Sequence, residues 1–232
     1  MANFFQITLI TIIAALLPTP VQAQKTPTAA ELFDHTDKIT GTVALSSIST
    51  IKAYAHVTVG ERSYDTTVNA AIVGGKIGDA QFTIIRDNIA TTYSDTKGAL
   101  EIKVGDTAPK ALPASMKAFI QGHQFHRRVL FPRMEFASHT PLSTESEFAG
   151  TSSYRVQGKA TDGSELSYHF DRNTQRMLGF QLTVMEENGP RPMNFVLKDW
   201  RTKAGQTLFW RLEISDKEDL YVYAFNKILL LP

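Results

Sequence analysis

The chain of 232 residues contains no cysteine. It therefore has no disulfide framework, no thiolate metal ligand and no cysteine nucleophile. A bacterial lipoprotein carries its lipid on a cysteine directly after the cleavage site of its signal peptide, and we expect no such lipid here. The apolar core, not covalent cross-links, must hold the fold together.

Charged residues are also missing before Lys25. The segment 7–17 is apolar apart from two threonines, and it is followed by Pro18, Pro20 and the string Val21-Gln22-Ala23. This pattern is typical of a cleavable signal peptide, so we predict cleavage between Ala23 and Gln24 and export, most simply to the bacterial periplasm. The start of the segment has no Lys or Arg, which leaves an uncleaved anchor or a transit segment as the alternative. Its compact apolar part is shorter than the roughly 20 residues that span a bilayer.

An excess of either charge is lacking as well, because 24 basic residues face 23 acidic ones and the formal net charge is +1. Such a balance does not favour a nucleic-acid partner. One local cluster is basic, and it comprises His123, His126, Arg127, Arg128 and Arg133. We interpret it as a solvated, polar stretch. Alternatively, Arg127, Arg128 and Arg133 form a docking surface for an envelope protein or for anionic headgroups.

No catalytic motif is present. The string Gly74-Gly75-Lys76 lacks the upstream glycine of a phosphate-binding loop, and Ser49-Thr50-Ile51-Lys52 lacks the companion motifs of penicillin-binding enzymes. A zinc site would need three or four converging ligands. Its candidate ligands are His123, His126, His139, His169 and Glu135. A hydrolase that pairs His123, His126 or His169 with a carboxylate is a further alternative, but we predict no enzyme, no metal and no cofactor.

The pattern changes from helical to strand-like along the chain. Residues 27–49 have helical spacing, with a capping box of Thr28 and Glu31 and an interruption at Gly41. Alternation of apolar and polar residues then predicts strands at 53–59, 64–73, 81–85, 89–93 and 99–104. A helical insertion is expected near 106–135, with Pro113 in the first turn of one helix.

The C-terminal part predicts a meander of antiparallel strands. The expected strands are 165–170, 178–184, 193–197, 208–214 and 220–231. Asp162-Gly163 and Asn188-Gly189 are hairpin turn signals, and strands joined by short turns are antiparallel neighbours. The last strand is apolar on both faces, so we expect it to be covered on both sides.

Together these elements predict the α+β class. Long antiparallel strands curl, and their apolar concave face must be covered. We expect one domain over 24–232, in which N-terminal and mid-chain helices cover a strongly curved sheet, an unclosed β-barrel or half-barrel. Seven apolar side chains line its concave face, as a ligand cavity or as a packed core, and strand periodicity favours the core. They are Tyr168, Phe170, Phe180, Leu182, Phe195, Trp210 and Leu212.

Two short strings and the order of the elements suggest a family. After a helix with Gly41, Leu45 and Ile48 come the segments 167–174 (SYHFDRNT) and 194–201 (NFVLKDWR). In this respect the chain resembles the LolA/LolB-like group of bacterial envelope proteins. In many uncharacterised members of that group, a Y-x-F-D-x-x-T hairpin precedes an F-x-D-(W/Y)-R strand end. The resemblance implies an unclosed barrel plugged by helices around a hydrophobic cavity. It also implies carriage or sensing of lipoproteins or other acylated molecules. No functional residue is carried over from the group.

The leading hypothesis is therefore a soluble exported carrier that holds a lipid-like or acylated ligand in the concave face. The alternative is a non-catalytic envelope module with a packed core that docks through the basic stretch 123–133. Partners would be a hydrophobic ligand, another envelope protein or a membrane surface contacted peripherally, and no nucleic acid.

Overall fold

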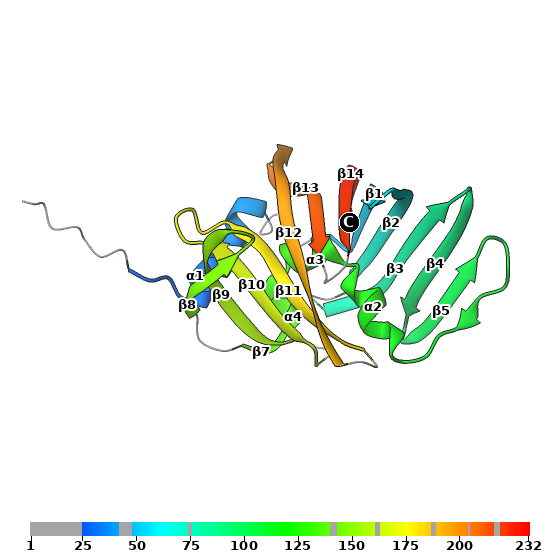
Figure 1. The fold of residues 1–232 in the computed structure, drawn as a ribbon, viewed down its shortest axis with the longest axis horizontal. Coiled ribbons are helices and arrows are strands. Elements are labelled where there is room, and N and C mark those ends of the chain that lie inside the picture. The colour runs from blue at the N-terminus through cyan, green and yellow to red at the C-terminus, as the bar shows by residue number, and fades with distance from the viewer. Residues whose placement is uncertain are drawn as a thin grey trace, which may run out of the picture.

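The computed structural model describes residues 25–41, 48–73, 76–139, 143–160, 163–186, 189–203, 205–215 and 219–232. One 14-stranded antiparallel sheet dominates it and curls without closing, while four short helices lie against the sheet (Figure 1). The predicted fold class is therefore confirmed. No helix of the described residues is long and apolar enough to cross a membrane.

The strands run in two sets around a helical segment. The first set is β1 (Thr50–Val59), β2 (Arg62–Val73), β3 (Lys76–Arg86), β4 (Ile89–Thr96), β5 (Ala99–Val104) and β6 (Lys110–Ala111). The second set begins with β7 (Phe136–His139), β8 (Ser143–Phe148), β9 (Thr151–Ala160) and β10 (Glu165–Asp171). It continues with β11 (Met177–Glu186), β12 (Gly189–Lys203), β13 (Gln206–Ser215) and β14 (Leu220–Leu231).

The helices are α1 (Ala29–Thr40), α2 (Met116–Gly122), α3 (Phe125–Leu130) and α4 (Pro132–Glu135). The predicted capping box starts α1: Thr28 Oγ1 accepts from the Glu31 amide, and the Glu31 carboxylate accepts from the Thr28 amide at 2.6 Å. The helix ends at Gly41, which adopts a φ of 74°, a left-handed conformation that glycine reaches without strain. The helix thus ends at the predicted interruption, and residues 42–47 of the predicted 27–49 lie outside the described residues.

The sheet order is β6-β5-β4-β3-β2-β1-β14-β13-β12-β11-β10-β9-β7, and β8 pairs with β9. The first and last strands of the chain are therefore neighbours in the middle of the sheet, where all of β1 pairs with β14. The ends of the order, β6 and β7, do not pair in the described part of the chain, so the barrel stays open. Helices α2, α3 and α4 lie within the curve of the sheet (Figure 1).

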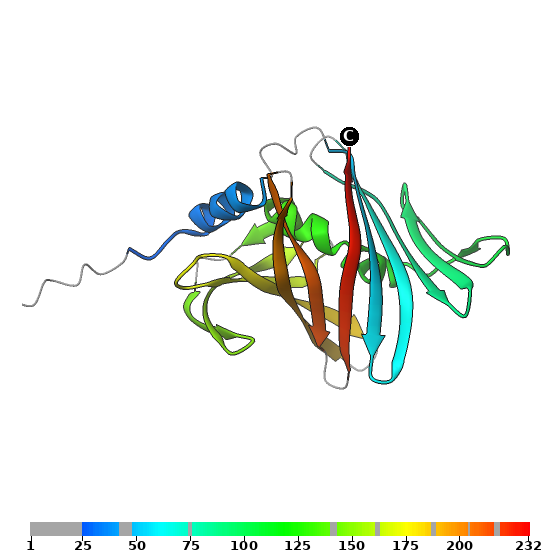
Figure 2. The same cartoon turned by 90° about the horizontal axis from the view of Figure 1, so that it is seen from above.

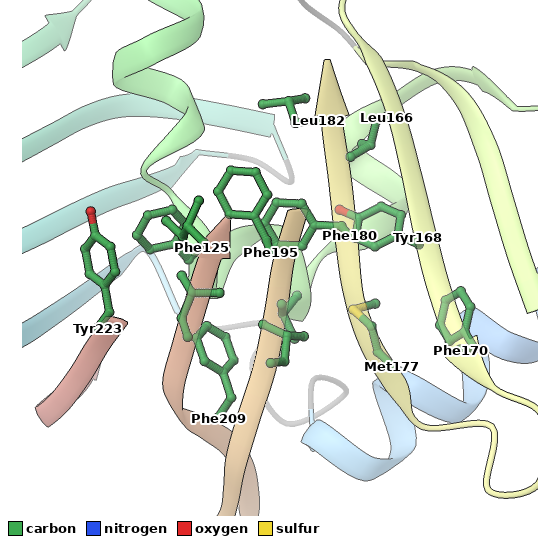
Figure 3. Packing of buried hydrophobic residues seen from close by; sticks show 14 of the residues in the cluster. Phe125, Leu166, Tyr168, Phe170, Met177, Phe180, Leu182, Phe195, Phe209 and Tyr223 are labelled. Atoms are coloured by element: carbon green, nitrogen blue, oxygen red, sulfur yellow. The ribbon is translucent and has the colours of Figure 1, made fainter. Parts of the chain in front are cut away.

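Aromatic side chains fill the centre of the concave face. Phe125 of α3 lies between Phe195 and Tyr223, with ring centroids 5.9 and 5.2 Å away. On the far side of Phe195, the Phe180 ring stacks at 4.4 Å, and Tyr168 follows (Figure 3). This main cluster is a packed core, because its members have at most 9% of their surface exposed.

The sheet divides at one place. Strands β13 and β14 pair only from Arg211 with Ala224 to Ser215 with Leu220. Beyond that point, 206–209 pairs with β12, while Phe225 and 227–231 pair with β1. The two strands separate toward the C-terminus (Figure 2). We call this region, between 206–210 and 225–231, the split.

Two irregularities flank the start of the split. The β1–β14 register shifts between Tyr54 and Ala55, which leaves Asn226 without a partner in that ladder. On the other side, the β12–β13 ladder passes over Asp199 and Trp210, and Asp199 adopts a φ of 54°. A bulge bends a strand and increases its local twist. The extra residue in β14 and the left-handed Asp199 in β12 both lie next to the point where β13 and β14 diverge.

Several expectations need correction. The last strand is not covered on both sides: its two ends, Leu220 and Leu231, are 51% and 40% exposed. Strands β7 to β9, within 136–160, were not predicted. Pro113 precedes α2 by three residues instead of standing in its first turn. The predicted signal peptide and the residue Leu45 lie outside the described residues.

Gly179 tests the close packing of β11. A Cβ atom at this position would lie 2.0 Å from the carbonyl oxygen of Phe195 and 2.7 Å from Phe148 Cε1. Because neither backbone nor core ring can yield cheaply, Gly179→Ala should lower the free energy of unfolding by at least about 2 kcal/mol in urea denaturation. Gly122→Ala is the control, since its Cβ would meet only Leu182 Cδ2 at 3.9 Å. Equal stability of the two variants would contradict this packing.

Candidate functional site

The most unusual feature of the concave face is a buried group of three charged residues. Arg127 Nη1 lies 2.6 Å from Glu135 Oε1, and Arg128 Nη1 lies 2.8 Å from Glu135 Oε2. All three residues are 1% exposed. We call them the Arg–Glu–Arg triad; it joins α3 to α4.

Neighbouring hydrogen bonds extend the triad into a polar network. The Tyr168 hydroxyl donates to the Arg128 carbonyl oxygen at 2.9 Å, and burial raises the pKa of Tyr168 well above its usual range. On the other side, Arg128 Nη2 donates to the Gln121 carbonyl oxygen at 3.5 Å, and Gln121 Nε2 donates to Asp95 Oδ2 at 2.8 Å. The network therefore links β4, α2, α3 and β10.

A polar pocket of about 370 Å³ opens onto this network. Besides the triad, residues of β3, the β4–β5 turn, α2 and β9 line it: Gly78, Asp79, Asp95, Lys97, Gly98, Lys117, Gln121 and Ala160. Three acidic and four basic side chains line it, so its walls do not favour an apolar ligand.

The triad corrects one sequence expectation. Arg127 and Arg128 were expected at the surface, either in a solvated stretch or as part of a docking surface. Instead α3 is buried along its whole length, and both guanidinium groups point into the protein. Only Arg133 is exposed, and it pairs with Asp34 of α1. The sequence held one signal for this burial: Phe125, Val129 and Leu130 enclose the two arginines, and Glu135 follows on the next helix.

The histidines stand apart from one another. His123 stacks on Phe82 of β3 at 3.9 Å, His126 on Phe209 of β13 at 4.1 Å, and His169 on Phe148 of β8 at 4.3 Å. Within the described ranges, no group of three or more His, Asp or Glu side chains is placed to hold a metal. The arrangement gives no support to the zinc or hydrolase alternatives.

The predicted lining residues divide between core and pocket. Tyr168, Phe170, Phe180, Leu182, Phe195 and Leu212 are buried in the main cluster. Trp210 is partly exposed, and it lines a second pocket of about 460 Å³. Contact of the buried six with a ligand stays a prediction.

This second pocket lies in the split, and we call it the split pocket. Strand β13 contributes Gln206, Leu208 and Trp210, and β14 contributes Ile228, Leu229 and Leu230. The remaining lining residues are Ile48, Arg201, Lys203 and Pro232. The Arg201 guanidinium stacks on the Trp210 ring at 5.1 Å and pairs with Asp199. The pocket therefore combines an apolar wall with two basic side chains. Sequence reasoning named only Trp210, because the others meet only through the divergence of the strands.

A smaller apolar cluster backs the split pocket. Leu208, which lines the pocket, also packs in a cluster with Ile51, Ala70, Ile72 and Leu130. Ile48, Ile228 and Leu230 border the same cluster and are only partly buried. The apolar wall of the pocket thus continues inward to the end of α3.

Comparison with solved structures identifies the fold as LolA/LolB-like, and so confirms the resemblance at that level. A LolA superfamily protein from Nitrosomonas europaea matches with a TM-score of 0.57 at 9% identity, over 89% of this chain and 95% of that one. A DUF1329 family protein from Desulfovibrio piger matches with a TM-score of 0.56 at 10% identity, over 86% and 92%. A putative outer membrane lipoprotein-sorting protein domain from Vibrio parahaemolyticus gives 0.53 at 12% identity, over 86% and 93%. No protein-family model and no curated protein matches the sequence.

Glu135 provides a test of the triad. Its replacement by glutamine leaves two buried guanidinium groups without their shared carboxylate, which should cost about 3 to 5 kcal/mol of unfolding free energy. Asp34→Asn is the control, because it removes the exposed partner of Arg133 and should cost no more than about 1 kcal/mol. Urea denaturation measures both. A loss for Glu135→Gln as small as that of the control would contradict the role of the triad.

His126 predicts a pH dependence of stability. Burial lowers the pKa of His126 from 6.5 to about 4 in the folded protein. The unfolded chain therefore binds more protons in this range, and stability falls as the pH drops from 6.5 toward 4. This histidine accounts for up to about 3 kcal/mol of that loss. His126→Phe, which keeps the stack on Phe209, should flatten the pH profile of the unfolding free energy, and an unchanged profile would contradict the assignment.

Proposed function

We propose that the protein is an exported binding or carrier protein for a lipid-like or acylated hydrophobic ligand. The observation that carries the proposal is the split pocket, an apolar opening in an unclosed half-barrel of LolA-like fold. Its volume of about 460 Å³ lies within the range of about 300 to 1,000 Å³ of small-ligand pockets.

The chemistry of the walls favours an amphiphile. Burial of each methylene group against Leu208, Leu229 and Leu230 contributes about 0.8 kcal/mol, so a short stretch of acyl chain supplies useful affinity. Arg201 and Lys203 lie at the same pocket and suit a negatively charged headgroup. Trp210 offers both an apolar ring and a polar N–H at this boundary.

The location of the pocket refines the sequence hypothesis. A chain bound in the main cluster would have to displace Phe125, and α3 is tied to α4 by the Arg–Glu–Arg triad. A chain in the split pocket meets no such obstacle. The proposed ligand contacts are therefore Leu208, Trp210 and Leu229, and deeper contacts with the predicted set would require movement of α3.

Export and periplasmic residence belong to the proposal too. They rest on the sequence pattern of the first 23 residues and on the fold. One solved structure of this fold is named an outer membrane lipoprotein-sorting protein domain.

A non-catalytic envelope module is the second candidate, and one observation favours it. The main cluster is densely packed, as expected for a scaffold that binds no ligand in its core. The version that docks through Arg127 and Arg128 does not fit, because both are buried.

A binding assay separates the two candidates. A fluorescent fatty acid should bind the purified, delipidated protein, and Leu229→Asp should weaken binding at least about 10-fold, because it places a charge in the apolar wall. Ile89→Asp is the matched control, since Ile89 is 55% exposed and lies on β4, far from the split in sheet order. It should bind as the wild type does. Absence of binding by the wild type, together with no lipid in solvent extracts, would refute the carrier and favour the scaffold.

A further inference from the structure

The outward face of the sheet around the split has an unusual charge. Its strands are β1, β12, β13 and β14, and their outward side chains include six bases and two acids in a chain of net charge +1. The bases are Lys52, Lys198, Arg201, Lys203, Arg211 and Lys227, and the acids are Asp199 and Glu213. We call this surface the basic face.

Strand pairing places these residues on one side. Lys52 and Lys227 both lie over the Tyr54 ring, at 5.2 and 5.5 Å, opposite to the inward residues Ala53 and Ala55. In the neighbouring strands, Lys198 pairs with Arg211, and Arg211 pairs with the exposed Ala224. Ala224 in turn pairs with His56 of β1, two residues from Tyr54.

The two acids do not neutralise this face. Glu213 is bridged by Lys198 at 2.6 Å and by Arg211 at 2.8 Å, and Asp199 is bridged by Arg201. Lys52, Lys203 and Lys227 form no ion pair with a described acid, so their charges remain available. All three lie on strands that border or flank the split.

Apolar side chains interrupt the basic face where the sheet divides. Trp210 and Leu229 line the split pocket and are partly exposed. Leu231, near the end of β14, is 40% exposed. A surface with lysines around exposed tryptophan and leucine side chains matches the boundary between the headgroups and acyl chains of a membrane.

We propose that the basic face docks the protein on an anionic lipid bilayer with the split toward the membrane. Each lysine near an anionic membrane surface contributes about 1 kcal/mol of binding free energy. The apolar side chains that lie between the lysines reach the membrane interface. The docking does not depend on the proposed ligand binding. Only the passage of a ligand chain between the membrane and the split pocket rests on the proposed function.

A bilayer fits this face better than a protein partner does. The basic side chains are spread over four strands, not gathered into a site for one carboxylate. An anionic lipid surface requires only a matching field and an apolar point of insertion.

Vesicle co-sedimentation tests the docking. The wild type should bind vesicles of phosphatidylglycerol and phosphatidylcholine in equal parts, bind poorly to pure phosphatidylcholine, and dissociate as salt is added. Lys52→Gln with Lys227→Gln should lower the partition coefficient about 25-fold, five-fold for each lysine. Lys103→Gln with Lys110→Gln removes two exposed lysines from β5 and β6 and is the matched control, which should bind as the wild type does.

The orientation has its own readout, because the chain has only two tryptophans. In the Trp200→Phe variant, Trp210 is the source of all tryptophan fluorescence. Its emission should shift to the blue on anionic vesicles, and brominated acyl chains should quench it. Absence of vesicle binding, equal loss in both lysine pairs, or an unquenched Trp210 would overturn the inference. Fatty-acid binding measured without vesicles tests the proposed function separately. The vesicle experiment can therefore fail while fatty-acid binding is found, and the reverse is also possible.

Discussion

The carboxylate shared by Arg127 and Arg128 is the interaction on which the interior of this protein depends. Two guanidinium groups and one carboxylate out of water are tolerable only together, so Glu135 fixes α3 and α4 relative to each other. That position places Phe125 between Phe195 and Tyr223 and fills the main cluster. An unclosed barrel would otherwise leave its apolar face open. Here the space is taken, and the apolar opening that remains lies at the split.

The split between β13 and β14 follows from the local backbone geometry of the strands on either side of it. On one side β14 accommodates an extra residue at Asn226, and on the other Asp199 takes a left-handed conformation. Both changes lie close to the last paired residues of β13 and β14, and the bulge in β14 adds local twist where the strands turn apart. Open strand edges invite association with other chains, and lysines are a common protection. Lys203 and Lys227 lie beside these two edges.

The strands could be predicted where the signal was local. Alternation in the C-terminal half, together with hairpin turns, is enough to specify antiparallel neighbours, and the capping box of Thr28 and Glu31 needs only three residues of spacing. The segment 136–160 was missed because its apolar residues are few and unevenly spaced. The burial of Arg127 and Arg128 was missed for another reason: charge predicts a surface position unless the partner is known, and Glu135 becomes their partner only through the turn between α3 and α4.

The candidate site illustrates the same limit. The inward aromatic residues were identified from periodicity, which favoured a packed core over a cavity, and the structure packs them. The split pocket arises from a departure from periodicity, where the register passes over Trp210. A ligand chain held there would lie at the side of the half-barrel and not within it, so binding and release would not require the triad to separate. A packed interior and the proposed carrier function are therefore compatible in one fold.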